Sequence, residues 1–447
     1  MSNLKKQIKL ITGVLATEKF KENFLQAFPL WVASLLTGLI AVGYAGLFGY
    51  AEQLLKYLFH AHRWSIFILT PLCFIVAWWI VQKFAPNAKG SGIPQVMAAI
   101  ELSNPKYNDK IDKLLSFRII IIKILSSITM VLGGAAIGRE GPTIQIAGSV
   151  FRLINKWIPE SWPKLSRQSY ILTGAAAGLA AAFNTPLGGV VFAMEELARI
   201  HVRFFRTALF SAVIIAGLTA QGILGPYLYL GYPYVGSLRF TIFFGIGITA
   251  ILTGIGGSLM AKLILKILKW RSAILMPAKI IGFILLSGIV ISLIAFFLNE
   301  KVLGSGKELM TTVLFTADKH EDWLTVLLRM VGPAISFGTG AAGGVFAPSL
   351  AAGASIGAFI SGLFDFFGSN ANILILSGMV GFLTGVTRTP FTSAILVLEM
   401  TDRHSVIFHL MIAALLSNLA ALLIDKHSFY DQLKKQYLLE ITGNTKT

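Results

Sequence analysis

An all-helical protein that crosses the membrane many times is the fold class that the sequence predicts. Three observations carry this prediction. Of the 447 residues, 55% are hydrophobic and 13% are charged, with a mean hydropathy of +0.73, which is far more apolar than an ordinary globular domain. Uncharged stretches that reach or approach the roughly 20 residues of a spanning helix recur along the chain. Glycine and proline interrupt further apolar stretches in short motifs.

The predicted spans share a lack of charged side chains. Five contain none, namely residues 24–51, 64–82, 170–194, 240–261 and 280–298. Three more contain one charge or none, namely residues 119–138, 373–398 and 406–424. Together with the shorter interrupted segments, they lead us to expect ten or more membrane-embedded helices in a single transmembrane domain over residues 1–447.

The formal charge of +17 follows the pattern of a membrane protein. Basic residues cluster between apolar spans, in one group of Lys262, Lys266, Lys269 and Arg271 and another of Arg199, Arg203 and Arg206. An excess of lysine and arginine in short loops marks the cytoplasmic side, so this distribution argues against nucleic acid as a partner. We therefore expect short cytoplasmic N- and C-terminal tails.

Residues for enzymatic chemistry are not grouped in this sequence. Cys73 is the only cysteine, and the seven histidines are scattered without a ligand pattern, so we expect neither a metal nor a cofactor. Residues 304–307 read GSGK, like part of a phosphate-binding loop. The first glycine of that loop is missing, however, and Glu308 replaces the required serine or threonine. We therefore expect a protein that is not an enzyme.

An internal repeat organises the chain. Residues 183–196 read FNTPLGGVVFAMEE and residues 387–400 read TRTPFTSAILVLEM, and in both a glutamate lies nine positions after the proline of Thr-Pro. Upstream, GGAAIGREGP at 133–142 matches TGAAGGVFAP at 339–348. The offset of about 205 residues indicates a duplication, and transporter halves of this kind commonly meet at a substrate site near the midplane. Similarity alone leaves open whether the halves run parallel or inverted.

Three glycine- and proline-containing motifs predict helix starts inside the membrane, at residues 90–94 (GSGIP), 138–142 (GREGP) and 343–348 (GGVFAP). Proline is tolerated in the first turn of a helix, and glycine allows the preceding backbone to turn sharply. A helix N-terminus carries roughly half a positive elementary charge and unpaired N–H groups, so several converging N-termini form an anion site. Irregular backbone at this depth is tolerated where it is buried or lines a cavity.

These three motifs, in this order and with the Thr-Pro repeats, resemble the signature segments of the CLC family of chloride channels and transporters. The resemblance extends over nearly the whole chain and includes a tyrosine soon after the last span. It implies two inverted-topology halves, whose broken helices meet at a midplane anion site, and a homodimer with one pathway per subunit. In this sequence the halves are expected at about residues 24–225 and 239–425. Many eukaryotic relatives carry large cytoplasmic regulatory domains after the last span, whereas the tail after Tyr430 is short here. The resemblance therefore implies no cytoplasmic regulatory domain and a location in the bacterial inner (plasma) membrane.

The resemblance also implies roles for individual residues. Ser91 and Tyr430 are expected to donate their hydroxyl groups to a central chloride, and Val345 and Phe346 to donate their backbone N–H groups. Neutral donors suit an anion that has to leave again, because a formal cation could hold it too tightly. From the residues alone, a plain N-cap is the favoured interpretation of Ser91, and an anchor at the membrane interface is the favoured interpretation of Tyr430.

Two glutamates are expected to move protons. Glu140 lies between glycines in an apolar region, where a carboxylate costs a few kcal/mol unless it is paired or protonated. In the family its equivalent is the gate, which competes with chloride when ionised and carries a proton when protonated. Glu196 matches the glutamate that takes protons from the cytoplasm in family exchangers, where channels commonly have valine. The alternatives are a salt bridge of Glu140 with Arg139, and a solvated Glu196 paired with Arg199 or Arg203.

The expected function is therefore secondary active exchange of chloride for protons across a bilayer. A passive chloride channel on the same fold is the main alternative, and a transporter of another anion is a more distant one. Two positions depart from some family exchangers, because Gln95 and Met97 stand where those proteins place carboxylates. Glu195 and Glu399, the repeat-related glutamates, are expected to be structural.

Overall fold

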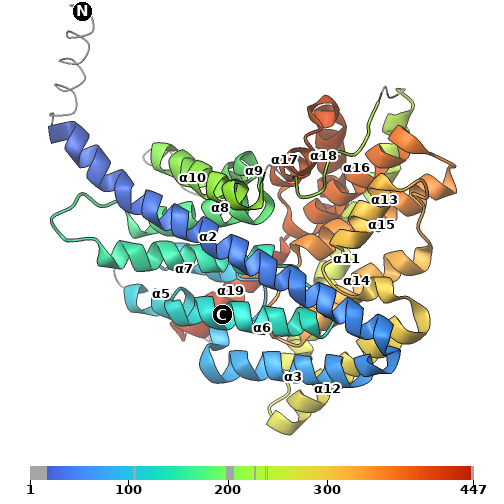
Figure 1. Ribbon diagram of the computed structural model, residues 1–447, viewed down its shortest axis with the longest axis horizontal. Helices are drawn as coiled ribbons and strands as arrows, with labels where there is room; N and C mark the ends of the chain where they lie inside the picture. Colours follow the sequence, from blue (N-terminus) through green and yellow to red (C-terminus); the bar gives the residue numbers. More distant parts are fainter. Residues whose placement is uncertain are drawn as a thin grey trace, which may run out of the picture.

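The computed structural model describes residues 18–103, 107–197, 206–225, 228–236, 238 and 240–443. The α-helices in this part of the chain are α2 (Glu18–Ala61), α3 (Ile66–Phe84), α4 (Ile93–Glu101), α5 (Asn108–Leu114), α6 (Phe117–Leu132), α7 (Glu140–Trp157), α8 (Arg167–Phe183), α9 (Pro186–Phe192), α10 (Arg206–Leu224), α11 (Ile242–Ser272), α12 (Pro277–Leu293), α13 (Lys307–Phe315), α14 (Trp323–Gly338), α15 (Phe346–Leu363), α16 (Gly368–Thr387), α17 (Pro390–Thr401), α18 (Ile407–Ile424) and α19 (Phe429–Thr442) (Figure 1). Short 3-10 turns are η1 (Arg63–Ser65), η2 (Pro86–Ala88), η7 (Glu300–Val302) and η8 (His404–Val406), and π-helical turns are η4 (Ala193–Leu197) and η6 (Ile294–Leu298).

By length and composition, nine helical segments of the described chain are suited to cross a membrane. They include α2, α3, α11 and α12, which cover four of the predicted uncharged spans. Two shorter apolar helices, α14 and α17, lie alongside the long ones. Helices α7 and α8 do not reach the same hydropathy, yet most of their residues are buried inside the bundle. The predicted all-helical, multi-spanning fold class is confirmed.

Two of the predicted spans are broken rather than continuous. The stretch 170–194 divides into α8 and α9 at Asn184, and the stretch 373–398 divides into α16 and α17 at Arg388. Both residues adopt the left-handed conformation that ends a helix, with φ of 57° and 63°. In each case Thr-Pro follows, and the proline starts the next helix at its first position. The breaks therefore fall at equivalent places in the repeat.

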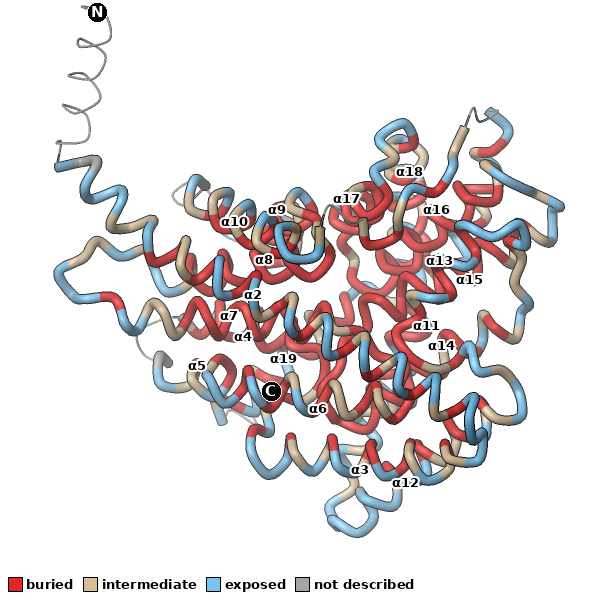
Figure 2. The backbone as a smooth tube through the Cα atoms, viewed as in Figure 1, coloured by how far each residue is buried: buried red, intermediate tan, exposed pale blue. Residues whose placement is uncertain are grey.

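The helices form an inner group and an outer layer. Nearly every residue of α15 and α16 is buried, whereas α3, α12 and α18 expose one face (Figure 2). The exposed faces carry large apolar side chains, such as Ile68 at 75%, Phe408 at 73% and Leu423 at 84% exposure. Such a surface is unfavourable in water and suits contact with lipid, so the outer layer is the one that meets the bilayer.

Candidate functional site

Four helix N-termini meet at the centre of the bundle. As the motifs predict, α4 begins directly after Gly90, Ser91 and Gly92, α7 begins at Glu140 and α15 begins at Phe346. The fourth is α19, whose first turn contains Tyr430. Each N-terminus presents backbone N–H groups that have no partner within their own helix. Together they give the site a positive potential without a formal charge.

Backbone hydrogen bonds between the motifs hold these N-termini in place. Gly138 and Gly344 exchange two N–H···O bonds of 2.8 Å, which joins the α7 start to the α15 start. The Gly90 N–H donates to the Ala341 carbonyl at 2.8 Å, and Gly343 donates to the Gly90 carbonyl at 3.1 Å. The three motifs are therefore linked through main-chain atoms, which places their helix starts independently of side-chain motion.

Ser91 and Tyr430 lie together at this centre. Their side chains are 1% and 0% exposed, and the phenol of Tyr430 is close to the Ser91 hydroxyl. Among the described residues, neither hydroxyl has a hydrogen-bond partner of normal geometry. Ser91 does not cap α4, because Gly92 is the N-cap, and Tyr430 is too deeply buried to be an interfacial anchor. Two buried donors without a protein acceptor are unfavourable by themselves and are suited to a bound acceptor.

Close packing around Ser91 explains the glycine of the second motif. A Cβ atom at Gly141 would collide with the Ser91 hydroxyl and come within 3.0 Å of its carbonyl oxygen. Phe346 completes the wall, because its ring stacks on the ring of Tyr430 with centroids 6.2 Å apart and planes inclined by 14°. Val345 precedes Phe346 as the N-cap of α15 and is 1% exposed. The structure thus brings the four predicted anion-site residues to one region.

The Glu140 carboxyl group reaches the same region. It is 1% exposed, and it lies beside the backbone N–H of Ala347 in the first turn of α15. Its Oε1 accepts a 3.4 Å hydrogen bond from the hydroxyl of Tyr229. The carboxylate therefore lies at a helix N-terminus, where a small anion would also be favoured.

Tyr229 was not predicted as a site residue. The uncharged, tyrosine-rich stretch 225–238 is typical of an interfacial loop on the outer face of a membrane protein, but Tyr229 is 3% exposed. Its ring packs edge-on against Phe183, with centroids 5.0 Å apart, and the Lys307 ammonium lies 4.7 Å from the ring centroid. Contacts between segments that are far apart in the sequence place Tyr229 in the site, and no local sequence pattern reveals such contacts.

Lys123 is a buried cation within α6, and it supports the first motif. Its ammonium donates to the carbonyl groups of Ala88 at 2.9 Å and Gly90 at 2.7 Å, and its side chain is fully buried. The single charged residue in the predicted span 119–138 thus directs its hydrogen-bond donors to backbone oxygens inside the protein. The turn that leads into Ser91 is fixed by this contact.

Glu196 lies apart from this centre, in a pocket of about 310 Å³. The pocket is lined by Met97, Glu195, Glu196, Arg388, Ser428 and Asp431, among others. Ser428 is the N-cap of α19, so the pocket extends to the helix that carries Tyr430. The carboxyl groups of Glu196 and Glu140 both lie within electrostatic range of Tyr430. Arg199 and Arg203, the predicted alternative partners of Glu196, lie outside the described residues.

Glu195 and Glu399 each cap the opposite repeat helix. The Glu195 carboxylate accepts from the N–H of Phe391 at 3.2 Å and from the N–H of Thr392 at 2.7 Å, at the start of α17. Glu399, near the end of α17, accepts from the N–H groups of Leu187 at 3.0 Å and Gly188 at 2.6 Å, at the start of α9. This reciprocal arrangement gives the two repeat glutamates the structural role that was expected of them.

Removing one of these caps is expected to lower stability. Glu195→Ala leaves two N–H groups of the α17 start without an acceptor, which costs about 1–3 kcal/mol. The midpoint of thermal unfolding in detergent should fall, and Glu399→Ala should lower it similarly. Glu160→Ala, at an exposed position in the α7–α8 connection, is the control. If Glu195→Ala and Glu160→Ala had the same midpoint of thermal unfolding, the caps would contribute nothing to stability.

Metal chemistry finds no support in the described part of the chain. No group of three or more histidine, cysteine, aspartate or glutamate side chains in that part could hold a metal ion. The chemistry of the site is that of neutral hydrogen-bond donors, two carboxyl groups and helix N-termini.

Comparisons with known proteins agree with this geometry. The family model described as voltage gated chloride channel matches residues 73–422. The chain belongs to the CLC family. The H(+)/Cl(-) exchange transporter ClcA of Salmonella paratyphi B is 28% identical over 431 residues, which cover 90% of this chain and 86% of that protein. The resemblance inferred from the three motifs is thus confirmed, and the protein is a CLC transport protein rather than an enzyme.

Solved structures of CLC proteins share the fold. A slow cyanobacterial Cl-/H+ antiporter superposes with a TM-score of 0.79 at 24% identity, covering 93% of this chain and 98% of the other. A CLC-type fluoride/proton antiporter gives 0.76 at 18% identity, with the same coverage. A eukaryotic CLC transporter gives 0.71 at 21% identity, covering 92% and 74%. The CLC relatives thus include proteins named for different anions.

Proposed function

We propose that this CLC protein exchanges chloride for protons. The observation that carries the proposal is the position of Tyr430. Among the described residues, neither its phenol nor the Ser91 hydroxyl has a hydrogen-bond partner of normal geometry, and the carboxyl groups of Glu140 and Glu196 both lie within electrostatic range of Tyr430. An anion held by these donors therefore shares its surroundings with two groups that can carry protons.

In the proposed cycle, the anion and the Glu140 carboxylate compete for one place. In this structure the Glu140 carboxyl group lies beside the Ala347 N–H at the α15 N-terminus, and in the proposed cycle the ionised form stays there. Protonation removes the negative charge, so the attraction to the helix N-terminus weakens and chloride takes the place. Glu196, in its open pocket, exchanges protons with the water on its side. Because chloride takes the place only when Glu140 has taken up a proton, the movements of protons and anions are coupled.

The donor set favours chloride as the anion. Ser91, Tyr430 and the backbone N–H groups of Val345 and Phe346 supply neutral hydrogen bonds, which replace hydration without trapping the ion. We further propose two inverted halves per subunit, a homodimer with one pathway per subunit, and both termini in the cytoplasm of a bacterial inner membrane.

Anion competition tests the choice of chloride. Liposomes that contain the purified protein are loaded with chloride. Their uptake of isotopic chloride is then measured in the presence of added unlabelled chloride, fluoride, nitrate or bromide. We expect unlabelled chloride to compete strongly and fluoride weakly. Strong competition by fluoride, or isotopic chloride uptake no faster than in protein-free liposomes, would contradict the proposal.

Tyr229 is proposed to hold Glu140 in its occupied position. Tyr229→Phe removes the hydroxyl that donates to Glu140 Oε1, at a cost of about 1 kcal/mol to that conformation, or roughly a fivefold change in populations. Chloride exchange at neutral pH should therefore become faster by up to this factor, with proton coupling retained. Tyr232→Phe is the matched control, because Tyr232 lies on the same loop and is 57% exposed. If Tyr229→Phe and Tyr232→Phe exchanged chloride at the same rate, Tyr229 would have no role in holding Glu140.

A further inference from the structure

Helix α19 carries Tyr430 to the central site, and it packs mainly against α4, the helix that follows Ser91. Two pockets flank α19. One has a volume of about 230 Å³ and is lined by Tyr437, and the other is the 310 Å³ pocket of Glu196, which is lined by Ser428. Because the packing is open on these sides, the contacts with α4 do most to hold α19 in place.

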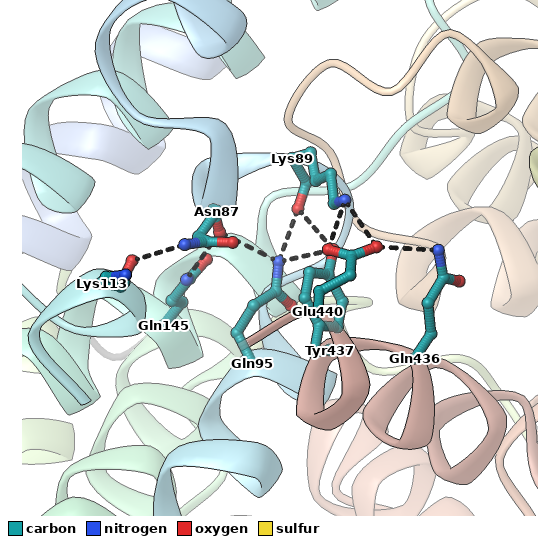
Figure 3. A network of polar contacts seen from close by, with 8 residues as sticks. All are labelled: Asn87, Lys89, Gln95, Lys113, Gln145, Gln436, Tyr437 and Glu440. Carbon is teal, nitrogen blue, oxygen red and sulfur yellow. Dashed lines mark hydrogen bonds and ion pairs between the residues drawn. The ribbon is translucent and has the colours of Figure 1, made fainter. Parts of the chain in front are cut away.

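Polar side chains join α19 to α4 and to the turn before it (Figure 3). The Tyr437 hydroxyl accepts a hydrogen bond of 3.0 Å from Gln95 Nε2, and it donates to the Lys89 carbonyl at 3.4 Å. The Glu440 carboxylate forms an ion pair of 2.9 Å with the Lys89 ammonium. The C-terminal half of α19 is therefore bound to the segment that leads into the first motif.

A further ion pair joins α19 to the other end of α4. The Lys434 ammonium lies 3.2 Å from the carboxylate of Glu101, the last residue of α4, and the Lys434 side chain is only 9% exposed. Tyr430, Lys434 and Tyr437 follow the spacing i, i+4, i+7, so they lie on one face of α19. A shift of α19 that breaks these contacts therefore also moves the Tyr430 phenol away from Ser91.

The amide of Gln95 suits this arrangement better than a carboxylate does. Its Nε2 donates to the carbonyl groups of Asn87 at 3.2 Å and Lys89 at 2.6 Å, as well as to the Tyr437 hydroxyl. An ionised carboxylate at this position would face the carbonyl oxygens with no proton to donate. The departure from the exchangers that place a carboxylate here thus gives this chain a donor that binds α19.

We propose that Tyr437 and Lys434 are positioning residues, which hold the Tyr430 phenol against Ser91 and thereby keep proton and chloride movement coupled. Ser91 and Tyr430 are both buried, so an anion between them reaches the neighbouring pockets only when α19 and α4 move apart. The contacts of Tyr437 and Lys434 with α4 oppose that movement. This inference rests on the proposed function, because it assigns the contacts that limit chloride movement without a proton.

The test compares Tyr437→Phe and Lys434→Gln with Lys435→Gln, in full-length protein in liposomes. Lys435 is the next residue on α19 and is exposed, so it controls for the loss of a charge from this helix. Loss of one buried hydrogen bond changes the population of a conformation about fivefold. We therefore expect Tyr437→Phe to move chloride up to about fivefold faster than the wild type, with more chloride ions moved per proton. Lys434→Gln should show the same changes at about twofold, because Glu101 is partly exposed to solvent.

Substitution of the partner on α4 shows whether the ion pair itself is responsible. Glu101→Gln should change the ratio of chloride to proton flux as Lys434→Gln does, and the double variant should change it little further, because both substitutions remove one contact. Lys434→Arg keeps a cation for Glu101 and should keep a ratio close to that of the wild type. A ratio in Tyr437→Phe and Lys434→Gln equal to that of Lys435→Gln would overturn the proposal. Slower chloride movement at an unchanged ratio would also overturn it, because that result indicates general structural damage.

Hydrogen exchange provides a second readout that does not depend on transport. The backbone amides of α19 should exchange faster in Tyr437→Phe than in Lys435→Gln, whereas those of the buried helix α16 should exchange equally in both variants. Equal exchange of the α19 amides would show that the Tyr437 contact does not hold this helix, and the proposal would be wrong. Failure of the proposed function would look different, because the wild type would then lack coupled chloride and proton movement while the difference in α19 exchange remained.

Discussion

Glu140→Gln is expected to retain chloride movement and to lose proton movement completely. Glutamine has nearly the shape of a protonated glutamate, but it has no charge and cannot carry a proton. It would therefore not compete with chloride at the α15 N-terminus, where the Glu140 carboxylate lies beside the Ala347 N–H. The measurement is simultaneous recording of chloride efflux and proton influx from liposomes that contain the purified variant.

A second carboxylate provides the control for this substitution. Glu308→Gln removes an exposed carboxylate that pairs with Lys56 and is not part of the anion site. It should preserve both fluxes at the wild-type ratio. If Glu140→Gln still moved protons in a fixed ratio to chloride, Glu140 would not be the proton-carrying gate.

Glu196→Val is expected to abolish coupled proton transport while chloride still crosses. The carboxyl group lies in the 310 Å³ pocket that extends to the N-cap of α19, within electrostatic range of Tyr430. Valine fills a similar volume and cannot hold a proton. The proton path would therefore end before it reaches the site, whereas the central donors remain. The readout is again the ratio of proton to chloride flux.

The adjacent glutamate makes this prediction specific. Glu195 lines the same pocket, but its carboxylate is bound by the α17 start. Glu195→Gln keeps an acceptor for these N–H groups and should keep the wild-type flux ratio. If Glu195→Gln lost proton coupling while Glu196→Val kept it, Glu195 and not Glu196 would be the residue on the proton path.

Much of the fold and of the central site could be predicted from local sequence. Long uncharged stretches reveal lipid-facing helices such as α3 and α12, because the bilayer selects for them directly. Glycine and proline at motif positions reveal helix starts, because the backbone geometry requires them. Three such starts do meet, and Ser91 is within reach of Tyr430 although the two lie far apart in the sequence.

Other features depend on contacts between distant segments, and local patterns do not record them. The breaks at Asn184 and Arg388 were hidden inside apolar runs, since the left-handed conformation of a helix end leaves little trace in composition. Tyr229 lies in an uncharged, tyrosine-rich stretch that is typical of a membrane interface, and this composition does not reveal that its side chain is buried. The exchange of caps between Glu195 and Glu399 becomes visible only when α9 and α17 lie side by side (Figure 1).

Proton pumping by the wild-type protein is the most direct test of coupled exchange. Liposomes with purified protein are given a chloride gradient, with the membrane voltage clamped by potassium and valinomycin and no initial proton gradient. Coupled exchange predicts that chloride flow drives protons in the opposite direction and builds a proton gradient that Glu196→Val does not build. Chloride flow without proton movement in the wild type would contradict exchange and identify a passive channel.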